Sequence, residues 1–306
     1  MVLYCKNVAV YDIDSNIVID KDLLPGLMRI DPHPATFKKW LKIRYSSNTN
    51  SLARQLKGIV FGQGNRVTIN KKTHALSLSD CYWVKDQSDT ITFEQISPYH
   101  APFWDGSGEY SGQSIPTLYV GGCLNKRWVS CETLEKFGNN LKIEEDVSRL
   151  CAECGVPANK VISISGGVAI RNITNTSVML EQADQSGMLD PDDFTEDDII
   201  RLFQLRGVQM LTIDAITANG DRHAGNFGWL RDTNTGRYLC MSPLYDFDHA
   251  LDSRLVKDRL LVDAVSSIKA TNNGQYVNEM RRICATVCRL DTVSLFKERA
   301  KVMLTL

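Results

Sequence analysis

The sequence lacks the features that mark membrane, exported or nucleic-acid-binding proteins. No apolar run approaches the roughly 18 residues that span a bilayer. The N-terminus alternates apolar and polar residues and meets acids early, unlike an export signal. The formal net charge is −1, from 35 basic and 36 acidic residues, so no overall basic field attracts nucleic acid. We therefore expect a cytoplasmic protein without direct nucleic-acid or membrane partners, and we leave secretion as an effector open.

Disulfides and a structural zinc site are not expected either. The nine cysteines are odd in number and occur in a long chain without an export signal, which favours free thiols in a reducing compartment. Cys151 and Cys154 form a C-x-x-C pair, but no second ligand pair stands at zinc-site spacing. Cys284 and Cys288 lie four apart on an expected helix. We interpret all of these as ordinary structural residues.

What the sequence does contain is typical of a globular protein of mixed structure. The 306 residues are 43% hydrophobic and 23% charged, enough for one large domain or two modest ones. Short alternating runs predict strands in roughly the first 100 residues, interrupted by one helix at 35–44. Helices are expected at 143–155, after an N-cap at Thr195, at 208–217 and from about 276 onward.

The order of these elements predicts the fold class. Strands come first and helices later, which indicates an α+β protein with segregated halves, and a two-lobed arrangement with a cleft between sheet and helices. We expect three parts: a β-rich region at 1–110, a small lobe at 111–185 and a helical lobe at 186–306. Strands at 118–129, 132–138, 160–165 and 177–183 would build the small lobe.

The chemistry is expected in the run N-G-D-R-H-A-G-N-F-G-W-L, residues 219–230, and in the later P-L-Y-D-F-D, residues 243–248. Phosphoryl transfer needs a carboxylate for the attacking hydroxyl and oxygen ligands for magnesium. Asp221 and Asn226 have the five-residue spacing of the catalytic Asp and metal-binding Asn in protein kinases. Asp246 follows 25 residues after Asp221, at the start of a D-F-x run, and completes the expected metal site.

A hairpin would bring these residues together. The apolar residues after Asn226 predict a strand, residues 231–238 a polar turn, and residues 238–247 a returning strand. Asp246 would then lie beside Asn226, and one carboxylate with one amide oxygen is a reasonable protein share for magnesium. His223 is expected to shape the loop by bonding its backbone. His33, His74, His100 and His249 show no metal-ligand spacing and receive no role.

The run G-D-R-H-A-G-N-F followed by P-L-Y-D resembles the signature of HipA-like Ser/Thr kinases, including the CtkA-type kinases. The resemblance covers residues 118–250 and, more loosely, the whole chain. Phosphoinositide kinases share the D-R-H-x-x-N loop. The sequence around the loop is therefore what favours HipA-like proteins over them. The resemblance implies a two-lobed kinase fold that uses ATP and Mg2+, with Asp221 as catalytic base and Asn226 and Asp246 as metal ligands.

The resemblance also implies the nucleotide site. Gly121, Gly122 and Lys126 match the family's phosphate loop, where glycines let backbone amides approach phosphate oxygens. Lys136 would contact the α- and β-phosphates, held by Glu144 or its neighbour Glu145. The strand at 177–183 resembles the hinge, so backbone groups from Met179 to Glu181 would bind adenine.

Three departures from the family pattern stand out. Leu124-Asn125-Lys126 replaces the family's Gln-x-Lys. No serine occupies the usual autophosphorylation position, so either Thr117 or Ser114 would substitute for it or this control would be absent. The segment between the phosphate loop and Lys136 is short.

Three functions are therefore open at this point. The first is a Ser/Thr protein kinase that is able to autophosphorylate and, as the resemblance implies, has a small helix-turn-helix antitoxin as partner. The second is a lipid or small-molecule kinase with the same centre. The third is a nucleotide-binding toxin–antitoxin module without turnover.

Overall fold

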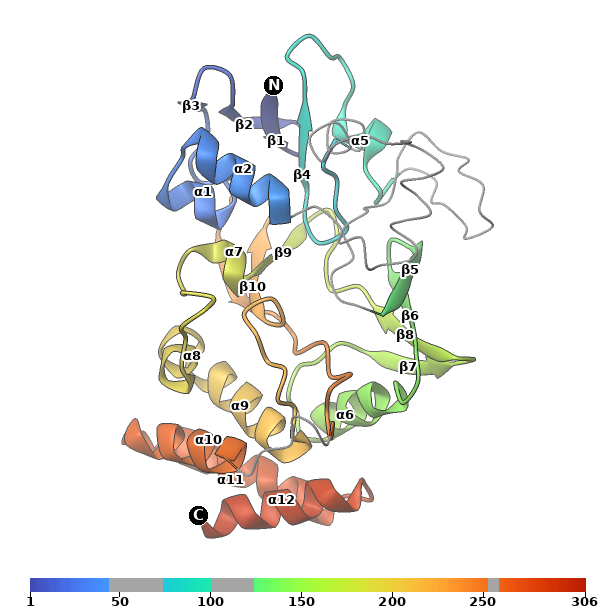
Figure 1. The fold of residues 1–306 in the computed structure, drawn as a ribbon, viewed down its shortest axis with the longest axis vertical. Helices are drawn as coiled ribbons and strands as arrows, with labels where there is room; N and C mark the ends of the chain where they lie inside the picture. The colour runs from blue at the N-terminus through green and yellow to red at the C-terminus, as the bar shows by residue number, and fades with distance from the viewer. Residues whose placement is uncertain (44–73, 101–123, 253–258) are drawn as a thin grey trace. The chain divides into compact units, whose positions relative to one another are not determined.

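The computed structural model describes residues 1–43, 74–100, 124–252 and 259–306 (Figure 1). Contacts divide the chain into two compact units built from interleaved segments. The first comprises Met1–Gly138, Ala169–Met188 and Gly228–Ser242, and the second comprises Asn139–Val168, Leu189–Phe227 and Pro243–Leu306. The three-part division expected from the sequence stays a prediction.

A four-stranded antiparallel sheet opens the first unit. Its strand order is β3-β2-β1-β4, with bounds β1 Val2–Cys5, β2 Val8–Asp12, β3 Ile17–Val18 and β4 Tyr82–Lys85. Two helices, α1 (Gly26–Ile30) and α2 (Pro34–Ile43), lie between β3 and β4 in the chain (Figure 1). Phe37 and Trp40 of α2 are buried with Trp83 of β4 in one apolar core, and the Phe37 and Trp40 rings lie 5.7 Å apart. Aromatic side chains bury large apolar areas, so this core stabilises the packing of α2 with β4.

The other strands of the first unit form two further groups of paired strands. β10 lies between β9 and β11, and β6 lies between β5 and β8. The bounds of these elements are β5 Asn125–Ser130, β6 Thr133–Phe137, β8 Gly167–Arg171, β9 Val178–Gln182, β10 Gly228–Asp232 and β11 Tyr238–Met241, with the short helices α5 Phe93–Ile96 and α7 Ala183–Ser186. Gly228 of β10 meets β9 so closely that a Cβ would lie 2.1 Å from the Glu181 carbonyl oxygen. Only glycine fits there.

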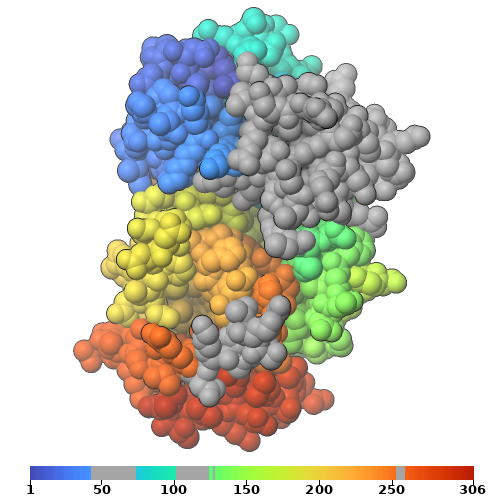
Figure 2. All heavy atoms as spheres, in the orientation of Figure 1, coloured from blue at the N-terminus to red at the C-terminus, as the bar shows by residue number. Residues whose placement is uncertain are grey.

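The second unit is mainly helical. It contains α6 Lys142–Glu153, β7 Val161–Ile164, α8 Glu196–Phe203, α9 Leu205–Thr217, α10 Arg259–Ala270, α11 Gly274–Arg289 and α12 Ser294–Thr305. Every residue of α9 from Gly207 to Thr217 is buried, because α8, α10, α11 and α12 all pack against it. The red and orange helices near the C-terminus form one continuous surface (Figure 2). α9 is thus the central support of this unit.

The expected α+β class is confirmed, and most expected elements are present. The helix expected at 35–44 is α2, and Thr195 caps α8 through a capping box with Asp198. The hairpin after Asn226 is also present, as β10 paired with β11. Strand β8 and helix α10 were not expected. β8 begins with glycine, which weakens a strand signal, and its pairing with β6 decides its conformation.

The thiols are free in the described part of the chain, as expected. Cys151 and Cys154 are fully buried. Burial raises the pKa of the Cys154 thiol to about 11 and raises that of Cys151 further. Metal binding and redox chemistry use thiolates, so the burial of this pair disfavours both. None of the described helices combines the length and the apolar character that crossing a membrane requires.

Candidate active site

The loop after α9 carries the expected catalytic residues and is shaped by its own hydrogen bonds. α9 ends at Ala218, whose φ of 51° lies in the left-handed region. His223 accepts the Gly225 backbone N–H at Nδ1 over 3.1 Å, so it has the shaping role that the sequence favoured. The Asn226 side-chain nitrogen donates to the Asp221 carbonyl over 3.2 Å.

Arg222 joins this loop to the segment that contains Asp246. Its Nη1 donates to the backbone carbonyls of Asn226 and Tyr245, each over 2.7 Å. The Tyr245 hydroxyl returns a hydrogen bond to the Gly225 carbonyl over 3.1 Å. Asn226 and Asp246 were expected to bind one metal. One hydrogen-bond network within the second unit thus links the segments that carry them.

The Arg222 guanidinium is itself held by Asp214 of α9. Its Nε donates to Asp214 Oδ2 over 2.9 Å and its Nη2 to Asp214 Oδ1 over 2.8 Å. Both side chains are nearly inaccessible, at 7% and 8% exposure. Burial acts to lower the pKa of Arg222, but the charge and hydrogen bonds of Asp214 outweigh it and raise that pKa. The sequence analysis missed Asp214, because an acid inside an apolar helix carries no motif.

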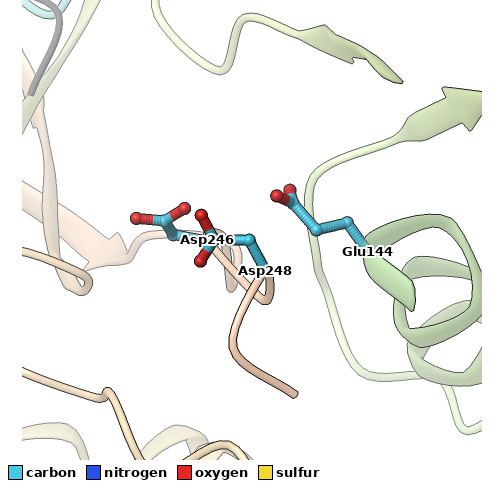
Figure 3. Close-up of side chains that lie close together, drawn as sticks. All are labelled: Glu144, Asp246 and Asp248. Atoms are coloured by element: carbon cyan, nitrogen blue, oxygen red, sulfur yellow. The ribbon is translucent and has the colours of Figure 1, made fainter. Parts of the chain in front are cut away.

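A cluster of carboxylates lies at the other end of this network. Oxygens of Glu144, Asp246 and Asp248 lie within 4.8 Å of one another. Glu144 points from the start of α6 toward the two aspartates of the loop after β11 (Figure 3). Asp246 has a φ of 62°, a left-handed conformation that is uncommon outside glycine and recurs at functional sites. Asp248 was missed by the sequence analysis, although its D-x-D spacing with Asp246 was a usable signal.

The donor set of this cluster fits a divalent cation with hard-ligand preferences. Magnesium takes oxygen ligands and retains water, and carboxylates that converge repel one another unless a cation neutralises them. Glu144 is 1% exposed, whereas Glu145 makes an exposed hydrogen bond with Ser163. The structure thus favours Glu144 over Glu145 as the functional acid.

His249, which received no role from the sequence, lies among acids of the same unit. Its Nε2 lies 3.8 Å from Asp221 Oδ2 and 3.9 Å from Asp248 Oδ1. Its Nδ1 lies 3.3 Å from Asp252 Oδ2. Sequence spacing gave no hint of this, because the contact with Asp221 depends on the folded loop.

Lys126, Lys136, Met179 and Glu181, which were expected at the nucleotide site, belong to the first unit, whereas Glu144 belongs to the second. Gly121 and Gly122 lie outside the described residues. Lys126 and Lys136 are directly opposite each other on β5 and β6, and both are buried, at 9% and 1% exposure. Because the two residues are paired across the strands, their side chains lie on the same face of the sheet.

The expected hinge residues lie on β9. Met179 is opposite Arg231, and Glu181 is opposite Trp229, in the pairing with β10. The Glu181 carboxylate forms a buried ion pair with Arg231 and accepts the Gly26 backbone N–H over 3.0 Å. The Glu181 side chain therefore has a structural partner set of its own, which the sequence analysis did not foresee.

Comparison with solved structures identifies the fold. A scan of protein-family models finds no match, and neither does a search of curated proteins. The chain is similar to HipA from Shewanella oneidensis MR-1, solved with HipB and operator DNA, at a TM-score of 0.59 and 12% identity. The match covers 99% of this chain and 96% of that one. The chain has the HipA-like fold.

A second solved structure is similar over a shorter part of the chain. It is the Helicobacter pylori proinflammatory kinase CtkA, with a TM-score of 0.39, 16% identity, and coverage of 59% of this chain and 88% of that one. Because the match to HipA covers nearly the whole chain, the N-terminal region is part of the HipA-like fold and not an added domain.

Proposed function

We propose that this protein is an ATP- and Mg2+-dependent phosphotransferase of the HipA-like type, which phosphorylates a Ser or Thr hydroxyl of a protein. One observation carries the proposal. In the second unit, Arg222 joins the loop of Asp221 and Asn226 to the segment of Asp246, and the Asp246 carboxylate lies with those of Glu144 and Asp248. A base and a set of hard oxygen ligands are the two parts that phosphoryl transfer needs from a protein.

Each residue has a distinct task in this proposal. Asn226, Asp246 and Asp248 would hold magnesium, which would supply positive charge to neutralise the phosphates. Asp221 orients the acceptor hydroxyl and takes its proton as the oxygen attacks the γ-phosphorus. The bond from the γ-phosphorus to the bridging oxygen breaks, and ADP leaves with the electron pair. Asp221 is 43% exposed, so a protein hydroxyl is able to reach it.

The first unit would supply the nucleotide contacts. We assign Lys136 to the α- and β-phosphates and Lys126, with Gly121 and Gly122, to the phosphate loop. Buried cations on one sheet face suit a polyanion, which supports this assignment. Backbone groups from Met179 to Glu181 are proposed to bind adenine.

Two further features belong to the proposal. The S. oneidensis HipA structure contains HipB and operator DNA, which supports a small helix-turn-helix antitoxin as partner of this chain. Autophosphorylation at Thr117 or Ser114 is also proposed, and both residues lie outside the described part. A lipid or small-molecule kinase, or a module that binds nucleotide without turnover, are the alternatives that the first experiment distinguishes.

That experiment incubates the purified chain with γ-labelled ATP, Mg2+ and a generic acceptor such as myelin basic protein. Label on protein that requires Mg2+ and disappears in Asp221→Asn supports the proposal, with a loss of about 100-fold or more expected for a general base. Asp246→Ala is expected to make the rate of labelling less dependent on Mg2+ and to weaken nucleotide binding as well. Asp248→Asn is expected to raise the Mg2+ concentration for half-maximal rate about tenfold.

The remaining outcomes decide among the alternatives. No protein label, with magnesium-dependent ATP binding by calorimetry, favours a small-molecule kinase or an inactive module. Phosphorylation of vesicle phosphoinositides in place of protein would favour the lipid reading. A fully active Asp221→Asn variant would refute the assigned base.

A further inference from the structure

We infer that Asp214 is a positioning residue that sets the spacing of the two metal-binding segments through Arg222. The inference rests on the proposed function, because it concerns the ligands assigned there. It adds a residue that lies outside the metal ligands and the catalytic loop. Its basis is the set of contacts that connects α9, the loop and the residue before Asp246.

Asp214 occupies an unusual place for a charged residue. It is 5% exposed on α9, the helix against which α8, α10, α11 and α12 pack. Acids are rarely so buried unless they are paired, because desolvation of a carboxylate is costly. An apolar residue at this position would pack without that cost. The burial of this position therefore does not explain why it holds an acid that is paired with Arg222.

The geometry of Arg222 supplies that explanation. A guanidinium is planar, so fixing Nε and Nη2 on one carboxylate also fixes the direction of Nη1. Nη1 is the atom that donates to the carbonyls of Asn226 and Tyr245. The Phe247 ring lies beneath the guanidinium, 4.9 Å from its central carbon, and limits tilting. Asp214 thus determines where the two backbone segments are held.

Asp214 also holds the beginning of the loop. Its Oδ1 accepts the side-chain nitrogen of Asn219 over 3.0 Å, and its backbone carbonyl accepts the Asn219 N–H over 2.9 Å. One residue on a rigid helix therefore anchors the loop at Asn219 directly and at Asn226 through Arg222. Catalytic and metal-binding groups need such support, because small displacements reduce affinity and rate strongly.

The experiment measures Mn2+ affinity by electron paramagnetic resonance, and kcat and KM for ATP alongside. Arg222→Lys keeps the charge but loses the planar fork. We expect about 10- to 100-fold weaker Mn2+ binding and a similar fall in kcat, with KM for ATP within about threefold of the wild type. The matched control is Arg201→Lys, the same change at an exposed ion pair with Asp198, which should change neither Mn2+ affinity nor kcat.

A second variant separates positioning from stability. Asp214→Leu with Arg222→Met replaces the buried pair by apolar residues, a change that often leaves stability equal or higher. We expect this double variant to fold and still bind Mn2+ at least tenfold more weakly. Wild-type Mn2+ affinity in the folded double variant would overturn the inference, because the pair would then serve stability alone. Wild-type affinity in Arg222→Lys would overturn it equally.

Failure of the proposed function gives a different result. If the wild type binds Mn2+ and ATP but transfers no phosphoryl group, the kinase proposal fails. The Mn2+ affinities of the variants then still decide the role of Asp214. If the wild type binds no Mn2+ at all, both proposals are overturned together.

Discussion

The carboxylate oxygens of Glu144 and Asp246 lie within 4.8 Å of each other, although about a hundred residues separate them in the chain. Glu144 lies in the first turn of α6, and Asp246 follows the β10–β11 hairpin. Two carboxylates this close repel each other, and a bound cation reduces the repulsion. Glu144, the acid expected to hold Lys136, thus lies close to Asp246 of the expected metal site.

Replacing Glu144 by Gln is expected to weaken binding of a divalent cation about tenfold, because one charge near the site is lost. Glu145→Gln is the matched control, since it makes the same change one residue away on an exposed hydrogen bond with Ser163. Calorimetric titration with Mg2+ in the presence of ATP measures both. Equal effects of the two substitutions would mean that Glu144 acts only through general charge.

Lys136→Ala is expected to reduce ATP affinity by about tenfold or more while leaving the fold intact, because a charge-assisted contact to phosphate is lost. Equilibrium binding of ATP measured by calorimetry tests this. The exposed Lys142→Ala serves as control, since Lys142 pairs with Asp146 on the surface of α6. Normal affinity and rate in Lys136→Ala would transfer the phosphate role to Lys126.

Arg231→Met is expected to destabilise the protein by about 3 to 5 kcal/mol, because it leaves the buried Glu181 carboxylate without its cation. Arg231 is fully buried and also donates to the carbonyls of Leu24 and Gly236. Urea unfolding monitored by circular dichroism gives the free energy of unfolding.

Combining Arg231→Met with Glu181→Leu should recover part of this loss, since no buried charge is then unpaired. Recovery will be incomplete, because the carbonyls of Leu24 and Gly236 still lack their donor. A single variant as stable as the wild type would show that Arg231 does not tie the N-terminal region to the sheet of β9 and β10.

Thiol reactivity is expected to differ strongly among the cysteines. Burial raises the pKa of Cys284 and Cys5 to about 12 and that of Cys154 to about 11. A raised pKa leaves little thiolate near pH 8, and the thiolate is the reactive form. Cys240 is exposed and should react first.

Iodoacetamide labelling at pH 8, followed by peptide mass mapping, should modify Cys240 in the native protein and Cys5, Cys154 and Cys284 only after unfolding in urea. Rapid native labelling of Cys154 would contradict its structural role. It would also reopen a redox or metal function for the C-x-x-C pair.

Local sequence determined much of the secondary structure and the identity of the central motif residues. Apolar spacing and a capping residue predict α2 and α8 because these signals act within a few residues. The alternation after Asn226 predicts the β10–β11 hairpin for the same reason. Asp221, Asn226 and Asp246 were assigned from spacing and from resemblance to HipA-like kinases.

Only the tertiary structure decided which side chains meet. Glu144 and Glu145 are equivalent in sequence, and burial against the Asp246 segment distinguishes them. Asp214 and Arg231 look like ordinary charged residues until the chain folds and removes them from water, when each needs a partner from a distant element. Such pairings depend on long-range packing, which short-range spacing does not encode. The sequence thus predicted the candidate reacting groups, and the fold decided what holds them in place.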